Sequence, residues 1–74
     1  MKILLLVIQE VIEKNNHTRI DHFFKVSRKM KFLTDEVTRR FGNNVFWERQ
    51  ENNMFFSQIS EKITATIAIM DIDE

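Results

Sequence analysis

No cysteine occurs in this 74-residue chain, so neither a disulfide nor a thiolate-bound metal ion can hold its fold together. A domain of this length lies near the lower limit that an apolar core can stabilise without such a cross-link. Hydrophobic residues make up 43% of the chain and include seven Phe and one Trp. That content is sufficient for a core and argues against disorder. We therefore expect a single small domain over residues 1–74.

Asparagine has to supply most of the turns, because the chain contains no proline and only one glycine. Asn tolerates the left-handed backbone region and hydrogen-bonds its own backbone, so Asn-Asn pairs favour turns. Three such pairs occur: Asn15-Asn16, Asn43-Asn44 and Asn52-Asn53. They divide the chain into an opening segment, a basic middle segment and a C-terminal third.

The middle segment has the strongest helical periodicity. At about 100° per residue its apolar side chains fall on one broad arc, which consists of Ile20, Phe23, Phe24, Val26, Met30, Leu33, Val37 and Phe41. Thr18 followed by Asp21 resembles a capping box, and Gly42 stands where a left-handed C-cap is expected. The pattern predicts a helix over residues 18–41.

Two alternatives remain for this segment. Thr34-Asp35-Glu36 is itself typical of a helix start, which would give two helices with a bend near Leu33. A strand through residues 20–32 would place apolar side chains at one parity: Ile20, Phe24, Val26, Met30 and Phe32. His22 and Arg28 share that parity and interrupt it, so we favour the helix.

The opening segment is also ambiguous. An apolar stripe at helical spacing runs through residues 2–14, and the polar residues from Gln9 onward keep that spacing. The run from Ile3 to Ile8 would equally suit a buried strand. The polar spacing favours a helix.

Strand formers dominate the C-terminal third. The spacing predicts strands at about residues 44–50, 54–59 and 63–72, with Asn52-Asn53 as a tight hairpin turn between the first two. The predicted fold class is α+β, with helical segments at about 2–14 and 18–41 packed on a three-stranded antiparallel meander.

The residue types that catalysis requires are missing or wrongly spaced. There is no glycine-rich loop to cradle a phosphate, and cysteine nucleophiles are absent. His17 and His22 lie five positions apart, whereas four would place two imidazoles on one helical face. Asp71, Asp73 and Glu74 are better explained as a fraying terminus than as a cation site. We expect no enzymatic activity, no cofactor and no metal.

Charge is unevenly distributed although the net charge is zero. Residues 14–40 carry eight cations against three anions, a balance of +5, and residues 41–74 carry two cations against six anions, a balance of −4. Such a distribution is usual for two solvated faces, and it also suits a protein that binds through one pole.

Phe32 is the most prominent binding candidate, because a continuous helix places it in the middle of the polar face. A large aromatic ring surrounded by charged groups is typical of a binding hot spot. The predicted partner-binding residues are Lys25, Arg28, Lys29, Phe32, Asp35, Glu36, Arg39 and Arg40. If the helix instead breaks at Leu33, Phe32 turns into the core.

The aromatic hairpin offers a second candidate surface, formed by Trp47, Arg49 and Phe56. A three-stranded sheet with helices on one side would leave its other face partly bare, and exposed aromatics there could bind a partner or a second copy of the chain. In the alternative, the two helical segments cover both faces.

These features favour a small accessory or inhibitor protein that docks on a larger protein through a basic helical face. The alternative is a nucleic-acid-binding regulator. The order of a helix, a basic helical segment and a hairpin loosely resembles a winged helix, which would use residues 25–40 and the hairpin 45–59. Against it, Asp35 and Glu36 would repel phosphate, and the apolar spacing after Ser27 runs one residue early.

The chain has no apolar stretch of the roughly 20 residues that a membrane span needs. The run from Ile3 to Ile8 is short for the apolar part of a signal peptide and no small-residue cleavage site follows it. We expect a cytoplasmic protein that does not bind membranes, in a bacterium, a virus or a host cell.

Overall fold

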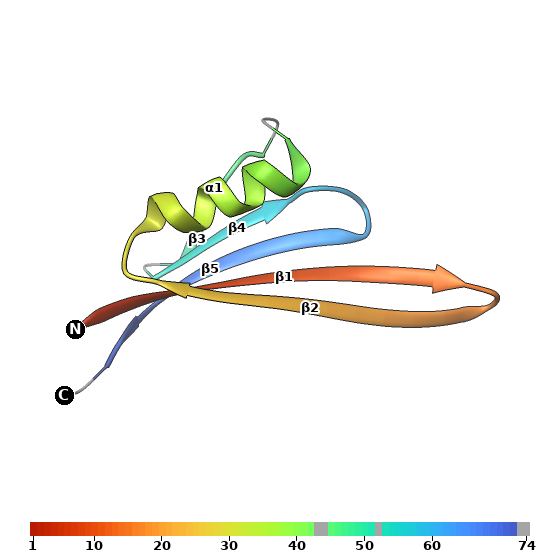
Figure 1. The fold of residues 1–74 in the computed structure, drawn as a ribbon, viewed down its shortest axis with the longest axis horizontal. Helices are drawn as coiled ribbons and strands as arrows, with labels where there is room; N and C mark the ends of the chain where they lie inside the picture. The colour runs from red at the N-terminus through yellow and green to blue at the C-terminus, as the bar shows by residue number, and fades with distance from the viewer. Residues whose placement is uncertain (43–44, 52, 73–74) are drawn as a thin grey trace.

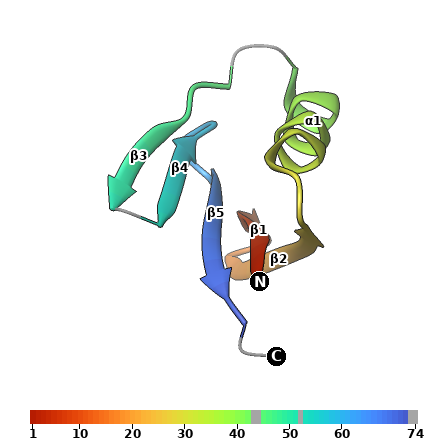
Figure 2. The same cartoon turned by 90° about the vertical axis from the view of Figure 1, so that its left-hand side faces the viewer.

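Five strands and one helix make up the fold in a computed structural model, which describes residues 1–42, 45–51 and 53–72. In chain order they are β1 (Lys2–Lys14), β2 (His17–Ser27), α1 (Met30–Phe41), β3 (Glu48–Glu51), β4 (Met54–Gln58) and β5 (Ile63–Asp71). The strands form one antiparallel sheet in the order β2-β1-β5-β4-β3. Helix α1 lies on one face of this sheet (Figures 1 and 2).

The predicted arrangement of helical segments on a three-stranded meander is wrong, because most of the N-terminal half is sheet. Residues 2–14 form β1, which hydrogen-bonds to β2 on one side and to β5 on the other. The run from Ile3 to Ile8 supplies both faces of this strand: Leu4, Leu6 and Ile8 are buried under α1, whereas Ile3, Leu5 and Val7 point to the opposite face and are partly exposed. The alternative of a buried strand was correct for this run.

Residues 17–27 form β2 where a helix was expected. Asn15 and Asn16 have φ values of 52° and 66°, as a two-residue hairpin turn with the favoured twist requires. From this turn β1 and β2 pair without interruption from Lys14↔His17 to Leu4↔Ser27. The helical arc and the strand parity share Ile20, Phe24 and Val26, and only the non-local pairing with β1 selects the strand.

Helix α1 therefore begins at Met30 and not at residue 18, and it continues through Leu33 without the second start considered above. Its predicted end is confirmed. Gly42 has φ 90°, and its N–H donates to the carbonyl of Thr38 at 2.8 Å. Arg39 and Arg40 lie in the last turn, where cations favour the negative end of the helix dipole.

The three C-terminal strands occur as predicted, although the first is shorter. It begins at Glu48 and not at residue 44, and a β-bulge between Arg49 and Glu51 disturbs its pairing with β4. The turn predicted at Asn52-Asn53 fits the pairing of Glu51 with Met54 on either side of it. Asn43, Asn44 and Asn52 lie outside the described residues.

The core lies between α1 and one face of the sheet. Alternate residues of β1 and β5 pack against the helix with two of its side chains, and together they are Leu4, Leu6, Ile8, Ala65, Ile67, Leu33 and Val37. The opposite parity of the same strands faces away from α1. One helix thus covers one face of a five-stranded sheet.

The β1–β2 hairpin extends beyond the helix. Pairing of β1 with β5 ends at Glu10↔Ile63, whereas pairing of β1 with β2 continues to Lys14↔His17. Residues 11–20 therefore form a two-stranded arm, which projects from the body of the molecule in Figure 1. The longest dimension of the molecule is 47 Å, against 27 and 21 Å for the other two.

The two faces of β5 make different contributions to stability. Ile67 is fully buried under α1, whereas Met70 belongs to the opposite parity and is 38% exposed. We expect Ile67→Ala to lower the free energy of unfolding by about 2–5 kcal/mol, because it leaves a cavity in the core. Met70→Ala is the matched control and should cost less than about 1 kcal/mol. Urea denaturation followed by circular dichroism measures both, and equal losses would contradict the assigned faces.

Candidate protein-binding surfaces

A buried carboxylate joins α1 to β2. Glu36 has a side chain only 5% exposed, and its Oε1 accepts a hydrogen bond from Nζ of Lys25 on β2 at 3.0 Å. Its Oε2 accepts from Nε of Arg40 at 3.2 Å and from the guanidinium of Arg39. The Arg40 guanidinium also lies 3.9 Å from the centre of the Phe23 ring, which belongs to β2. Three cations thus fix the carboxylate between helix and sheet.

The same contacts hold the pKa of Glu36 at about 2, below its ordinary value of 4.5. The hydrogen bond from Arg39 is the largest cause, followed by that from Lys25. Burial acts in the opposite direction, and Arg40 adds a smaller lowering. The carboxylate therefore stays charged in the folded protein over the whole physiological pH range.

Phe32 lies on the solvent side of α1. Its side chain is 55% exposed, and Nζ of Lys29 lies 5.5 Å from the centre of its ring. Lys31 and Asp35, also on α1, face solvent with their charged atoms 3.9 Å apart. The alternative in which Phe32 enters the core at a bend is not what the structure has. We call the exposed side chains around this ring the helix surface: Arg28, Lys29, Lys31, Phe32, Asp35 and Arg39.

The structure separates the eight residues predicted to bind a partner into two groups. Five of them belong to the exposed helix surface: Arg28, Lys29, Phe32, Asp35 and Arg39. The other three, Lys25, Glu36 and Arg40, meet in the contact between α1 and β2, although the ends of Lys25 and Arg40 reach solvent. Arg39 takes part in both groups, because its guanidinium is exposed and also bonds Glu36. Glu36 is buried because three cations surround it, so it stabilises the fold and is not available to a partner.

The face of the sheet turned away from α1 is apolar and exposed. Figure 2 shows the helix on one side of the sheet, and no described element covers the other side. We call this side the outer face; its apolar residues, assigned by strand register, are Ile3, Leu5, Val7, Val11, Ile20, Phe24, Val26, Met54, Phe56, Ala68 and Met70. Phe24, Val26 and Ile20 are the most open, at 60%, 57% and 49% exposed.

Charged side chains border this outer face without entering its centre. By register, Glu13 lies on it at the tip of the arm, and Glu48 and Glu51 lie on it along β3. Within the described strands, the charged residues of this parity are all acidic. The outer face therefore combines apolar side chains with the uncharged polar side chains of Gln9, Thr64 and Thr66 and with an acidic border. The basic helix surface lies on the other side of the molecule.

Sequence reasoning missed most of the outer face. The helical interpretation of residues 18–41 assigned Ile20, Phe24 and Val26 to the core, although the strand alternative had grouped them on one face. The second candidate surface is divided among different sides: Phe56 lies on the outer face, whereas Arg49 has the opposite parity. Trp47 packs against the core cluster.

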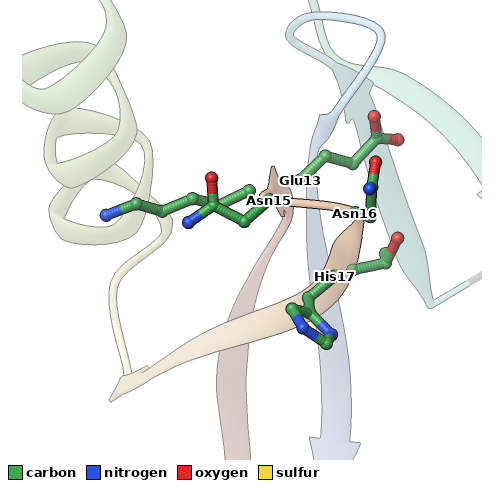
Figure 3. A pocket seen from close by; sticks show the side chains of 6 residues that line it. Glu13, Asn15, Asn16 and His17 are labelled. Carbon is green, nitrogen blue, oxygen red and sulfur yellow. The ribbon is translucent and has the colours of Figure 1, made fainter.

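The hollows of the surface do not have the features of a small-molecule binding site. The first, about 380 Å³ in volume, surrounds the hairpin turn between Glu13 and Thr18. In Figure 3 the side chains of Asn15 and His17 point away from those of Glu13 and Asn16, so these groups do not converge on one ligand position. Another is a small apolar hollow of about 190 Å³, lined by Met30, Thr34, Trp47 and Phe55. Ligand pockets usually measure about 300–1,000 Å³ and combine apolar walls with converging polar groups. The first hollow lacks the convergence, and the second lies below this size.

Within residues 1–42, 45–51 and 53–72, no cluster of three or more His, Asp or Glu side chains could hold a metal ion. In the part of the chain that the structure describes, no helix has the length and apolar composition needed to span a bilayer. Comparison of the chain with models of known families, with curated proteins and with solved structures finds no match.

The depressed pKa of Glu36 makes stability depend on pH in a defined window. Between about pH 4.5 and pH 2 this carboxyl is charged in the folded chain and protonated in the unfolded chain. Unfolding therefore takes up a proton, and the contribution of Glu36 to stability, present above pH 4.5, is lost as pH falls towards 2. We expect Glu36→Gln to be less stable than the wild type at pH 7, and the difference to shrink across that window.

Urea denaturation at a series of pH values measures this difference. Asp35→Asn, which removes the same charge from the exposed side of α1, is the control and should change stability by less than about 0.5 kcal/mol at pH 7. A gap between wild type and Glu36→Gln that stays constant from pH 7 to pH 2 would contradict the assigned role of the ion cluster.

Proposed function

We propose that this chain is a non-catalytic binding protein, an accessory or inhibitor protein that docks on a larger protein through the outer face of its sheet. The observation that carries the proposal is the exposure of Ile20, Phe24 and Val26 on an apolar sheet face with no described element over it. Soluble monomers rarely expose a large contiguous apolar patch unless it meets a partner.

The size of the outer face supports a protein as the partner. Five strands at a spacing of about 4.8 Å, with a mean length of about eight residues at about 3.4 Å each, cover roughly 650 Å². A standard interface takes about 800 Å² from each protein, with a range that begins near 600 Å². The outer face is therefore large enough to form one side of a specific complex.

The charged residues at the border of the outer face indicate which kind of partner it fits. Glu13, Glu48 and Glu51 border the outer face, so it fits an apolar protein surface bordered by Lys and Arg. The same acidic border disfavours an anionic membrane or a nucleic acid on this side. Such a border steers the partner and sets its orientation, whereas burial of the apolar centre supplies most of the affinity.

The helix surface is a second candidate for the contact. Phe32 combines 55% exposure with a flanking Lys29 ammonium group, which is the arrangement of an aromatic anchor among charged side chains. The basic helical face thus remains a candidate docking site, with a smaller apolar area than the outer face.

Nucleic-acid binding has weaker support. The winged-helix resemblance required a helix in the opening segment, and residues 2–14 are the central strand β1. The basic residues Lys25 and Arg40 are engaged with Glu36. DNA therefore serves as a control in the experiment below.

The test compares two outer-face variants with a helix-surface variant. Phe56→Ala removes an aromatic ring from the outer face, and Glu48→Lys reverses the acidic residue that pairs with Phe56 across β3 and β4. Phe32→Ala is the control on the other side of the molecule. Each purified chain is used to capture proteins from a lysate of the cells that express it, the captured protein is identified by mass spectrometry, and its affinity for each variant is then measured by calorimetry.

We expect Phe56→Ala to weaken binding at least about tenfold, as removal of a buried aromatic anchor does. Glu48→Lys should slow association with a partner bordered by cations, and Phe32→Ala should leave affinity unchanged. Loss of affinity in Phe32→Ala alone would reject the outer face in favour of the helix surface. Salt-sensitive binding of mixed-sequence DNA, with no protein captured, would reject the proposal.

A further inference from the structure

We infer that β2 is a dimerisation edge, along which a second copy of this chain adds its own β2 in antiparallel orientation. The inference concerns the edge of the sheet and does not depend on which protein meets the outer face. In the described sheet β2 pairs with β1 alone. It runs for 11 residues, with a register to β1 that is unbroken from Lys14↔His17 to Leu4↔Ser27.

The opposite edge of the sheet is built differently. Strand β3 has four residues, carries Glu48, Arg49 and Glu51, and contains a bulge. Short length, charge and bulges are the features by which edge strands avoid pairing with another chain. Strand β2 carries Arg19, Asp21 and Lys25 but is long and regular, so of the two edges it is the one better suited to accept another strand.

Hairpin geometry identifies the backbone groups that such a strand would meet. A two-residue turn makes Lys14 and His17 a hydrogen-bonded pair, and the pairs alternate along the ladder from there. The odd-numbered residues of β2 consequently bond to β1. The even-numbered residues direct their N–H and C=O groups to the open edge: Thr18, Ile20, His22, Phe24 and Val26.

Charge and length of overlap distinguish the registers that a two-fold axis permits. An axis at Phe23 sets Asp21 opposite Lys25 of the second copy, twice, over a nine-residue overlap. Within each copy Asp21 is already paired with Arg19 and Lys25 with Glu36, so the contact between copies would extend these ion pairs. Moving the axis to His22 would set Arg19 opposite Lys25, and moving it to Asp21 would set two aspartates face to face. Like charges directly opposite each other destabilise a strand pair. An axis at Ile20 would set Arg19 opposite Asp21, and one at Phe24 would set Asp21 opposite Ser27, but each overlap spans only seven residues of β2. Charge and length of overlap together therefore favour the axis at Phe23.

The projecting arm also favours the register with its axis at Phe23. Two-stranded hairpins are marginally stable in water, yet residues 11–20 project beyond α1 without a third strand. Helix α1 lies over the other half of β2, where Glu36 contacts Lys25 and Arg40 contacts Phe23. An axis at Phe23 therefore places part of each arm beside the helix-covered end of β2 of the other copy. The two α1 helices then lie over opposite halves of the pair of β2 strands.

On the outer face the same register extends an aromatic cluster. The rings of His22 and Phe24 are already stacked, with centroids 6.0 Å apart. In the dimer His22 lies opposite Phe24 of the second copy, and Ile20 lies opposite Val26. The outer faces of the two copies then form one continuous surface over ten strands.

The test uses a backbone change that affects only the open edge. His22→Pro removes an N–H that points away from β1, so the monomer should keep its fold, since proline is tolerated at such positions of an edge strand. His22→Ala keeps the N–H and is the matched control. Masses are measured by analytical ultracentrifugation from nanomolar to high micromolar concentrations, and circular dichroism checks each fold.

We expect the wild type and His22→Ala to reach twice the chain mass of 8.9 kDa. His22→Pro should stay at the mass of one chain with an unchanged spectrum. A wild type that stays monomeric throughout, or a dimer that survives His22→Pro, would overturn the inference, and neither result bears on capture of another protein through Phe56.

Asp21→Lys tests the register separately. In the proposed pairing it sets two lysines opposite each other on both sides of the axis, so the dissociation constant should rise at least tenfold and the loss should be partly relieved by salt. An unchanged dissociation constant would mean that residue 21 does not face a cation of the second copy, and would overturn the register.

Discussion

The pairing of β1 on both sides is the constraint on which the rest of the structure depends. Its contacts with β2 and β5 bring the first and last parts of the chain together, and they fix which side chains meet α1. Leu4, Leu6 and Ile8 enter the core because this register puts them on the helix side. A slip of one residue would exchange the two faces of the strand, so both the core and the outer face follow from this register.

A single helix covers only one face of this sheet. Without a disulfide, the chain relies on a small core and on the ion cluster of Glu36, which ties α1 to β2. The apolar residues of the outer face recur at strand spacing but contribute little to that core. A partner at the outer face would contact these side chains, whereas a second copy at the edge of β2 would contact backbone amides. The two proposed contacts can therefore exist together.

Side chains of opposite charge predominate on the two sides of the molecule, the helix side and the outer face. The exposed cations of the helix surface lie on one side and the acidic border of the outer face on the other, so two partners of opposite charge could be bound without competing. The uneven charge along the chain was visible in the sequence. Its assignment to opposite sides required the register of β3 and the position of α1.

The sequence by itself determined the local features: the Asn15-Asn16 turn, the end of α1 at Gly42 and the β character of the C-terminal third. It left Phe32 either exposed or in the core, and the structure shows it 55% exposed. Only the tertiary structure decided the first 27 residues. Apolar spacing there fits a helix and a strand about equally, and the choice depends on the pairing of β1 with β2 and with β5, the latter some 60 positions away in the chain. The outer face was missed for the same reason, because Ile20, Phe24 and Val26 are core residues on a helix and exposed residues on an edge strand.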